Sequence, residues 1–265
     1  MAVVSVSRRC DVPAYQADQF MQNIRSGGVY VEHPYSRQVN YVSLHPDDVT
    51  ALVFWSKNYA PLERHFEELR RSYHCIFHYT ITGLPRSVEP DIPSYQDSID
   101  RFISIAKSFS PDHSIWRYDP VIFCDEFDEE YHIQTFERIA RQLAGYTFRC
   151  YTSFVQRYSK NDKRMMPIYD RCISDPQRQI RLAQMLADIA ASYGIGIYAC
   201  CCPVMLSAGI PQAHCIDKKQ IETVTGYDVS YLKPKPSRKG CGCYASIDIG
   251  TYGVCKGGCL YCYAR

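Results

Sequence analysis

The sequence lacks the features that would assign it to a membrane, secreted or strongly charged class. No apolar run approaches the ~18 residues that a membrane-spanning helix needs, so we expect no membrane partner. The formal net charge is +2, which gives no strong field toward nucleic acid or an anionic surface. The apolar part of the opening stretch, MAVVSVSRRC, is too short for the core of a signal peptide. We therefore expect a cytoplasmic protein.

Cysteine, in contrast, is abundant, with 14 cysteines in 265 residues. In a reducing compartment, clustered thiols serve metal binding or catalysis more often than disulfides. Isolated cysteines such as Cys75, Cys150 and Cys172 lie in apolar or helical segments, and we interpret them as ordinary core or surface positions. The clustered cysteines are therefore the candidates for function.

Strand-like and helix-like segments alternate along most of the chain. Strands are predicted at 3–7, 39–43, 51–55, 75–81, 114–118, 147–155 and 195–199. Apolar residues at helical spacing follow Pro13 and recur at 61–71, 99–106, 133–143 and 182–189. Repeated βα units at this length favour an α/β fold whose parallel sheet closes into a TIM-like (β/α) barrel, whole, partial or circularly permuted.

The composition of the sequence changes after Gly226. Residues 233–240, KPKPSRKG, have the composition of an exposed connector, and an irregular cysteine-rich stretch follows them. We predict a barrel domain over 1–232 and a cluster-binding tail over 233–265 that packs over the barrel mouth.

Polar clusters follow several predicted strands, at 7–11, 56–58, 80–83, 117–120 and 200–202. Strand ends of a barrel converge on one face, where active sites lie. The cations expected to orient an anionic group of a small-molecule substrate or cofactor are Arg8, Arg9, Lys57 and Arg117. Asp11 and Asp119 would fix these cations or move protons. The alternative is that each charged residue forms a structural ion pair at the barrel rim.

Three cysteines near the end of the chain, Cys255, Cys259 and Cys262, have the spacing C-x3-C-x2-C. Zinc is one candidate, and it would take a fourth ligand from Cys241 or Cys243. A 4Fe–4S cluster is the other, because three thiolates leave one iron open to S-adenosylmethionine. Two glycines, Gly257 and Gly258, would let the loop fold tightly around either group.

The fuller motif, CKGGCLYCYA, resembles the signature of radical S-adenosylmethionine enzymes and especially that of the spore photoproduct lyase branch. The whole chain is similar to an uncharacterised bacterial family that carries such a cluster at its C-terminus. The matching stretches are SRRCDVPA, VFWSKN, WRYDP, CIDKKQIE and CGCYASIDIGTYGVCKGGCLYCYA.

This resemblance implies a barrel, a 4Fe–4S cluster on the three tail cysteines, and Tyr261 shielding the cluster and touching S-adenosylmethionine. It also implies a reductant protein as partner, and only analogy with the lyase suggests a nucleic-acid substrate. Radical enzymes of this kind carry the motif after their first strand, so its place here implies a circularly permuted barrel.

Further thiols lie outside the tail motif. A second cluster would use Cys241 and Cys243 with one or two thiols from Cys200, Cys202 or Cys215. The alternative is a structural loop beside buried small residues. If residues 200–202 are extended, Cys201 should point away from its neighbours.

Two rivals to the radical enzyme remain open at this point. One is an iron–sulfur redox or sensing protein that does not cleave S-adenosylmethionine. The other is a zinc-stapled barrel that binds a small ligand.

Overall fold

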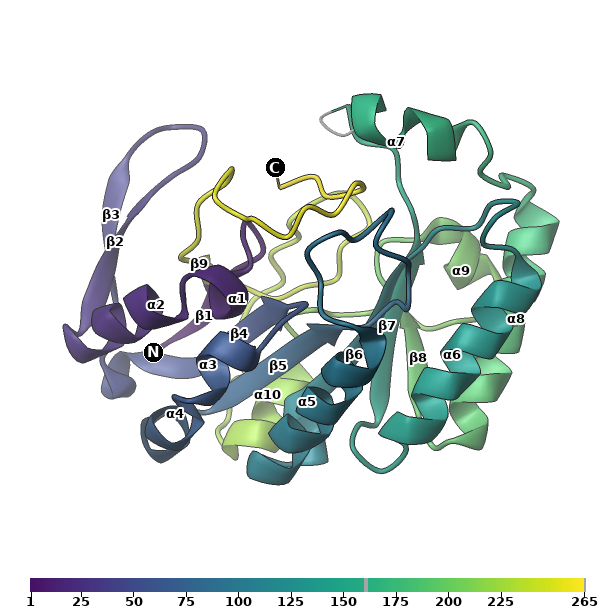
Figure 1. Ribbon diagram of the computed structural model, residues 1–265. Helices are drawn as coiled ribbons and strands as arrows, with labels where there is room; N and C mark the ends of the chain where they lie inside the picture. The colour runs from purple at the N-terminus through teal and green to yellow at the C-terminus, as the bar shows by residue number, and fades with distance from the viewer. Residues whose placement is uncertain (160–161, 265) are drawn as a thin grey trace.

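The computed structural model describes residues 1–159 and 162–264 and has an α/β fold built on a seven-stranded sheet (Figure 1). The strand order is β8-β7-β6-β5-β4-β1-β9, and every neighbouring pair is parallel. The strands of this sheet are β1 (Ala2–Val6), β4 (Val49–Ser56), β5 (Cys75–Thr80), β6 (Ser114–Val121), β7 (Arg149–Phe154), β8 (Gly196–Ala199) and β9 (Ile247–Asp248). The prediction of a parallel α/β sheet is confirmed.

The predicted closed barrel is not formed by the described residues, because the sheet is open and ends at β8 and β9. One reason lies between β1 and β4. The predicted strand at 39–43 is β3 (Val39–Ser43), which pairs antiparallel with β2 (Gly28–Glu32) in a separate ribbon. A barrel of this type needs eight parallel strands, and residues 39–43 do not contribute one because they lie outside the main sheet.

Helices connect the parallel strands, and each of the five predicted helical segments lies in a helix or a pair of helices. They are α1 (Val12–Tyr15), α2 (Ala17–Arg25), α3 (Ala60–Glu63), α4 (Phe66–Ser72), α5 (Tyr95–Ser108), α6 (Glu129–Leu143), α7 (Asp162–Tyr169), α8 (Pro176–Ser192), α9 (Pro203–Ser207) and α10 (Lys218–Thr225), with 3-10 turns η1 (Pro46–Asp48) and η2 (Pro111–His113). The predicted helix at 61–71 is divided between α3 and α4, whereas α7, α9 and α10 were not predicted. Among the helices described, none has the length and apolar character needed to cross a membrane.

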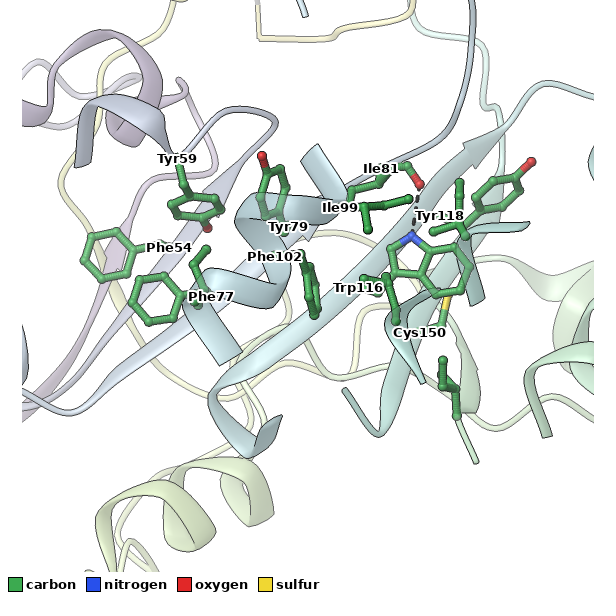
Figure 2. Close-up of a cluster of buried hydrophobic side chains, with 14 of the residues drawn as sticks. Phe54, Tyr59, Phe77, Tyr79, Ile81, Ile99, Phe102, Trp116, Tyr118 and Cys150 are labelled. Carbon is green, nitrogen blue, oxygen red and sulfur yellow. Dashed lines mark hydrogen bonds between the residues drawn. The ribbon is translucent and has the colours of Figure 1, made fainter. Parts of the chain in front are cut away.

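The two faces of the sheet bury alternate side chains of each strand. Phe54, Phe77 and Trp116 lie in the larger core (Figure 2). The Trp116 indole donates a hydrogen bond of 3.0 Å to the Ile81 carbonyl, so its one polar atom is satisfied. Val53 and its neighbours on the opposite face form a second core with α10 and with the loops around 200, 215 and 243.

The tail lies over the carboxyl ends of the central strands, between the β2–β3 ribbon and α7 (Figure 1). It is less irregular than predicted, because β9 pairs with β1 and extends the sheet. Farther on, the Leu260 amide donates to the Val88 carbonyl at 3.0 Å, and Arg164 of α7 donates to the Cys262 carbonyl at 2.9 Å. The tail therefore contacts one end of the sheet at several separate points.

Candidate functional site at the carboxyl ends of the strands

Asp248 of β9 organises the end of β1. Its carboxylate accepts hydrogen bonds from the Ser5 hydroxyl at 2.7 Å and from the Arg8 amide at 2.8 Å. The guanidinium nitrogens of Arg8 and Arg9 each lie 3.8 Å from the same carboxylate. Both arginines thus lie at the carboxyl end of β1, but they pair with Asp248, an acid that was not among the predicted site residues.

Asp11 joins the ends of β1 and β4. It caps α1 by accepting from the Ala14 amide at 3.1 Å, and it also accepts from the Ser56 hydroxyl at 2.6 Å and the Lys57 amide at 2.9 Å. Burial raises the pKa of the Asp11 carboxyl to about 6, although these hydrogen bonds oppose the shift. Its contacts are those of a structural brace between two strands.

Glu89 is a buried acid that receives three donors from separate segments. It accepts from the Lys57 ammonium at 2.8 Å, from the Thr82 hydroxyl at 2.9 Å, and from the Tyr261 hydroxyl. Burial, and then the negative charge of Glu89, hold the pKa of Tyr261 well above its usual value. Glu89 therefore fixes the tail tyrosine beside Lys57, whose ammonium lies 5.7 Å from the centre of the Tyr261 ring.

The three tail cysteines face this region. Cys259 is buried, and Cys255 and Cys262 are half-buried. Burial raises the pKa of the Cys259 thiol to about 12, and the neighbouring Cys262 and Cys255 thiols act in the same direction, whereas Lys57 opposes them. The thiols are therefore near enough to influence one another electrostatically.

Gly258 makes the tight loop possible. Its φ is +70°, and a Cβ at this position would lie 2.7 Å from Cγ of Pro90 and 2.9 Å from the Asp91 carboxylate. Only glycine fits both the left-handed backbone and this close approach. Gly257 is also buried, and its ideal Cβ position is 3.7 Å from the Cys255 sulfur.

Arg117 and Asp119 lie at the end of β6 and pair with each other at 2.5 Å. Ser153 also donates to Asp119, at 2.5 Å. The Arg117 guanidinium further donates to the Cys215 thiol at 3.2 Å. Arg8, Lys57 and Arg117 thus share one end of the sheet, but each is neutralised by a different acid.

A cavity of about 250 Å³ lies beside Glu89, between the end of β5 and the start of α5. Its lining includes Thr82, Arg86, Glu89, Ser94 and Tyr95. Sequence reasoning missed Glu89 and Arg86, because they lie within a loop, away from the polar clusters at strand ends. Their only signal is charge within an apolar, proline-rich segment.

The upstream cysteines lie on the other face of the sheet. Cys200, Cys215, Cys241 and Cys243 come together there, as predicted, and Cys201 joins them. Cys202 lies instead in the larger core with Met205, away from these thiols. The expected alternation fails because Cys201 has a φ of +52°, so the segment is not extended.

The described residues contain no group of three or more His, Cys, Asp or Glu side chains already placed to hold a metal ion. The chain is thus a parallel α/β protein in which cysteine-containing loops pack on both faces of the sheet. The chain belongs to the family described as Domain of unknown function (DUF1848), whose model matches residues 3–264. No curated protein matches the chain. The resemblance of the cysteine motif to spore photoproduct lyase stays a prediction from the sequence.

Proposed function

We propose that the chain binds a 4Fe–4S cluster through Cys255, Cys259 and Cys262 and acts as a radical S-adenosylmethionine-type enzyme. The observation that carries this proposal is the C-x3-C-x2-C spacing of the three cysteines in a loop whose Tyr261 lies beside Lys57. Bound by three thiolates, such a cluster keeps one iron open to S-adenosylmethionine and supplies one-electron chemistry.

The residues around the thiols suit an anionic, thiolate-bound group. Burial raises the pKa of the Cys262 thiol, and the positive charges of Arg164 and Lys57 partly oppose this shift and so favour the thiolate. Arg164 also fixes the loop by donating to the Cys262 carbonyl at 2.9 Å and to the Cys259 carbonyl at 3.4 Å. Soft thiolates are the donors that iron–sulfur clusters select.

The chain's own residues would position the reactants. Glu89 accepts hydrogen bonds from Tyr261 and Lys57 and so fixes both side chains beside the tail loop. The Tyr261 ring would then shield a bound cluster. The cavity beside Glu89 would take the substrate, and Arg86 in its lining would pair with an anionic group. Arg8, Arg9 and Arg117 are already paired with Asp248 and Asp119, so we assign them to holding the strand ends in place.

The test is anaerobic purification, followed by measurement of iron, zinc and sulfide per chain in Cys255→Ala, Cys259→Ala and Cys262→Ala. We expect each variant to lose the iron and sulfide of this site, because too few ligands remain. Cys75→Ala, at the start of β5 and so at the opposite end of the sheet from the tail, is the control and should keep wild-type content. Unchanged iron in the three variants would refute the assignment of the ligands.

The reaction class is tested on the iron-loaded wild type by reduction in the presence of S-adenosylmethionine. Methionine and 5′-deoxyadenosine should form, and the Cys259→Ala protein should form neither. Iron without these products would indicate a redox or sensing protein. Zinc without sulfide would indicate a stapled ligand-binding domain.

A further inference from the structure

Five thiols lie together on the face opposite the larger core, those of Cys200, Cys201, Cys215, Cys241 and Cys243. The Cys243 amide donates to the Cys241 sulfur at 3.4 Å. The Cys200 and Cys215 sulfurs are 3.7 Å apart. We call these residues the thiol ring. They come from three loops that are distant in the sequence, so the fold itself gathers them.

Backbone hydrogen bonds hold the three loops in register. The Cys200 amide donates to the Thr152 carbonyl at 2.8 Å, which continues the pairing of β7 with β8. The Tyr244 amide donates to the Ile216 carbonyl at 3.1 Å, which ties the loop of Cys241 and Cys243 to that of Cys215. The ring therefore does not depend on side-chain placement alone.

Gly242 leaves room where the last two loops meet. A Cβ at this position would lie 2.7 Å from the His214 imidazole, so a larger residue would require that side chain to shift. Glycine at the centre of the C-x-C sequence thus suits the contact between the loops.

Hydrogen-bond donors surround the ring. Arg117 is buried, pairs with Asp119, and donates to the Cys215 thiol at 3.2 Å and to the Cys200 thiol at 3.7 Å. The Ser237 hydroxyl donates to the Cys241 thiol at 3.5 Å. Donors directed at sulfur stabilise thiolates and anionic thiolate-bound centres, whereas neutral thiols packed in a core need no such cations.

We propose that the thiol ring is a second metal site, separate from the tail cysteines, at which four of the five thiolates bind an iron–sulfur cluster or a zinc ion. Both centres take four cysteine ligands and both are anionic when so bound. Because no three of these side chains already converge on one point, binding requires rotation of thiols about their Cα–Cβ bonds. The site does not depend on the function proposed for the tail.

The experiment uses the full chain with Cys255, Cys259 and Cys262 all changed to Ala, which removes the tail motif. Iron, sulfide and zinc per chain are measured after anaerobic purification and again after incubation with a chelator. We expect this triple variant to retain metal. Adding Cys215→Ser or Cys243→Ser should lower the retained metal at least tenfold, whereas Cys202→Ser should not, since Cys202 lies in the other core.

The two metals are separated by sulfide and by visible absorbance, which a cluster gives and zinc does not. Circular dichroism shows that each variant is folded, and the single ring variants in the wild-type background repeat the test should the triple variant unfold. Equal metal in the Cys215→Ser, Cys243→Ser and Cys202→Ser proteins would overturn the proposal. So would a folded triple variant that binds neither zinc nor a reconstituted cluster. The two proposals are tested separately, because metal that depends only on the tail cysteines refutes the thiol ring, and metal that depends only on the ring cysteines refutes the tail site.

Discussion

Replacing Asp248 with asparagine should loosen the tail, because this carboxylate holds β9 against β1. One carboxylate oxygen accepts from the Ser5 hydroxyl and the Arg8 amide, and the other accepts from the Ser7 hydroxyl and the Gly250 amide at 3.0 Å. Either orientation of the asparagine directs its NH2 group at one of the two backbone amides. A serine hydroxyl can rotate to accept, but a backbone N–H cannot.

The magnitude follows from that mismatch. A buried N–H left without an acceptor costs about 1–3 kcal/mol. Loss of charge toward Arg8 and Arg9, whose side chains are 25% and 18% exposed, adds roughly 0.2–1 kcal/mol each at such partly solvated positions. We therefore expect Asp248→Asn to lower the free energy of unfolding by about 1.5–5 kcal/mol.

The assay is urea unfolding together with limited proteolysis of the tail. Asp228→Asn is the matched control, because Asp228 is exposed and accepts only from the nearby Ser230 in the described contacts, so its loss should cost well under ~1 kcal/mol. Cleavage within 240–264 should become faster in Asp248→Asn than in the control. A change below ~1 kcal/mol, with wild-type protection of the tail, would refute the reasoning.

Two further predictions concern the same end of the sheet. The raised pKa of Asp11, about 6 against 3.8, means that the folded state holds its proton more tightly; this stabilisation is complete below pH 3.8 and is lost as the pH rises through 6. Urea unfolding from pH 4 to 6.5 should therefore show wild type losing stability relative to Asp11→Asn, by at most about 3 kcal/mol, and parallel pH profiles would contradict this. Gly258→Ala places a Cβ on a left-handed backbone and against Pro90. It should therefore lower the free energy of unfolding by roughly 1–3 kcal/mol more than Gly253→Ala does. Gly253 is the control because its φ of +79° is similar, but a Cβ there would meet nothing within 4 Å. Thermal unfolding of both variants measures the difference, and equal losses would show that the clash is relieved.

The positions of most strands along the chain and the burial of the sheet on two faces were accessible from the sequence, because they depend on local patterns. The near-continuous apolar runs of β4 and β5 predict burial on both sides, and the helical stripes mark the crossovers. Sheet closure was not accessible. It depends on whether the strand at 39–43 joins the sheet or folds back on β2, and the alternation of a single strand does not distinguish the two.

The position of the candidate site was predictable, but the pairing within it was not. The end of a parallel strand gathers polar residues wherever the chain places them, so Arg8, Lys57 and Arg117 lie at one end as predicted. Asp119 is two residues from Arg117, but the acids that pair with Arg8 and Lys57, Asp248 and Glu89, are 240 and 32 residues away in sequence. No local pattern encodes such pairs. The left-handed backbone of Cys201, a non-glycine residue, could not be predicted from the local sequence either.

The pairing of β9 with β1 has a consequence for how the chain is made. Without β9, the apolar strand β1, with sequence AVVSV, would present an unpaired edge, and such edges template association with other chains. β1 is synthesised long before β9, so a growing chain carries this edge unpaired until residue 248 has left the ribosome. The two residues of β9, Asp248 among them, therefore cover an edge that stays open during the synthesis of every other strand of the sheet.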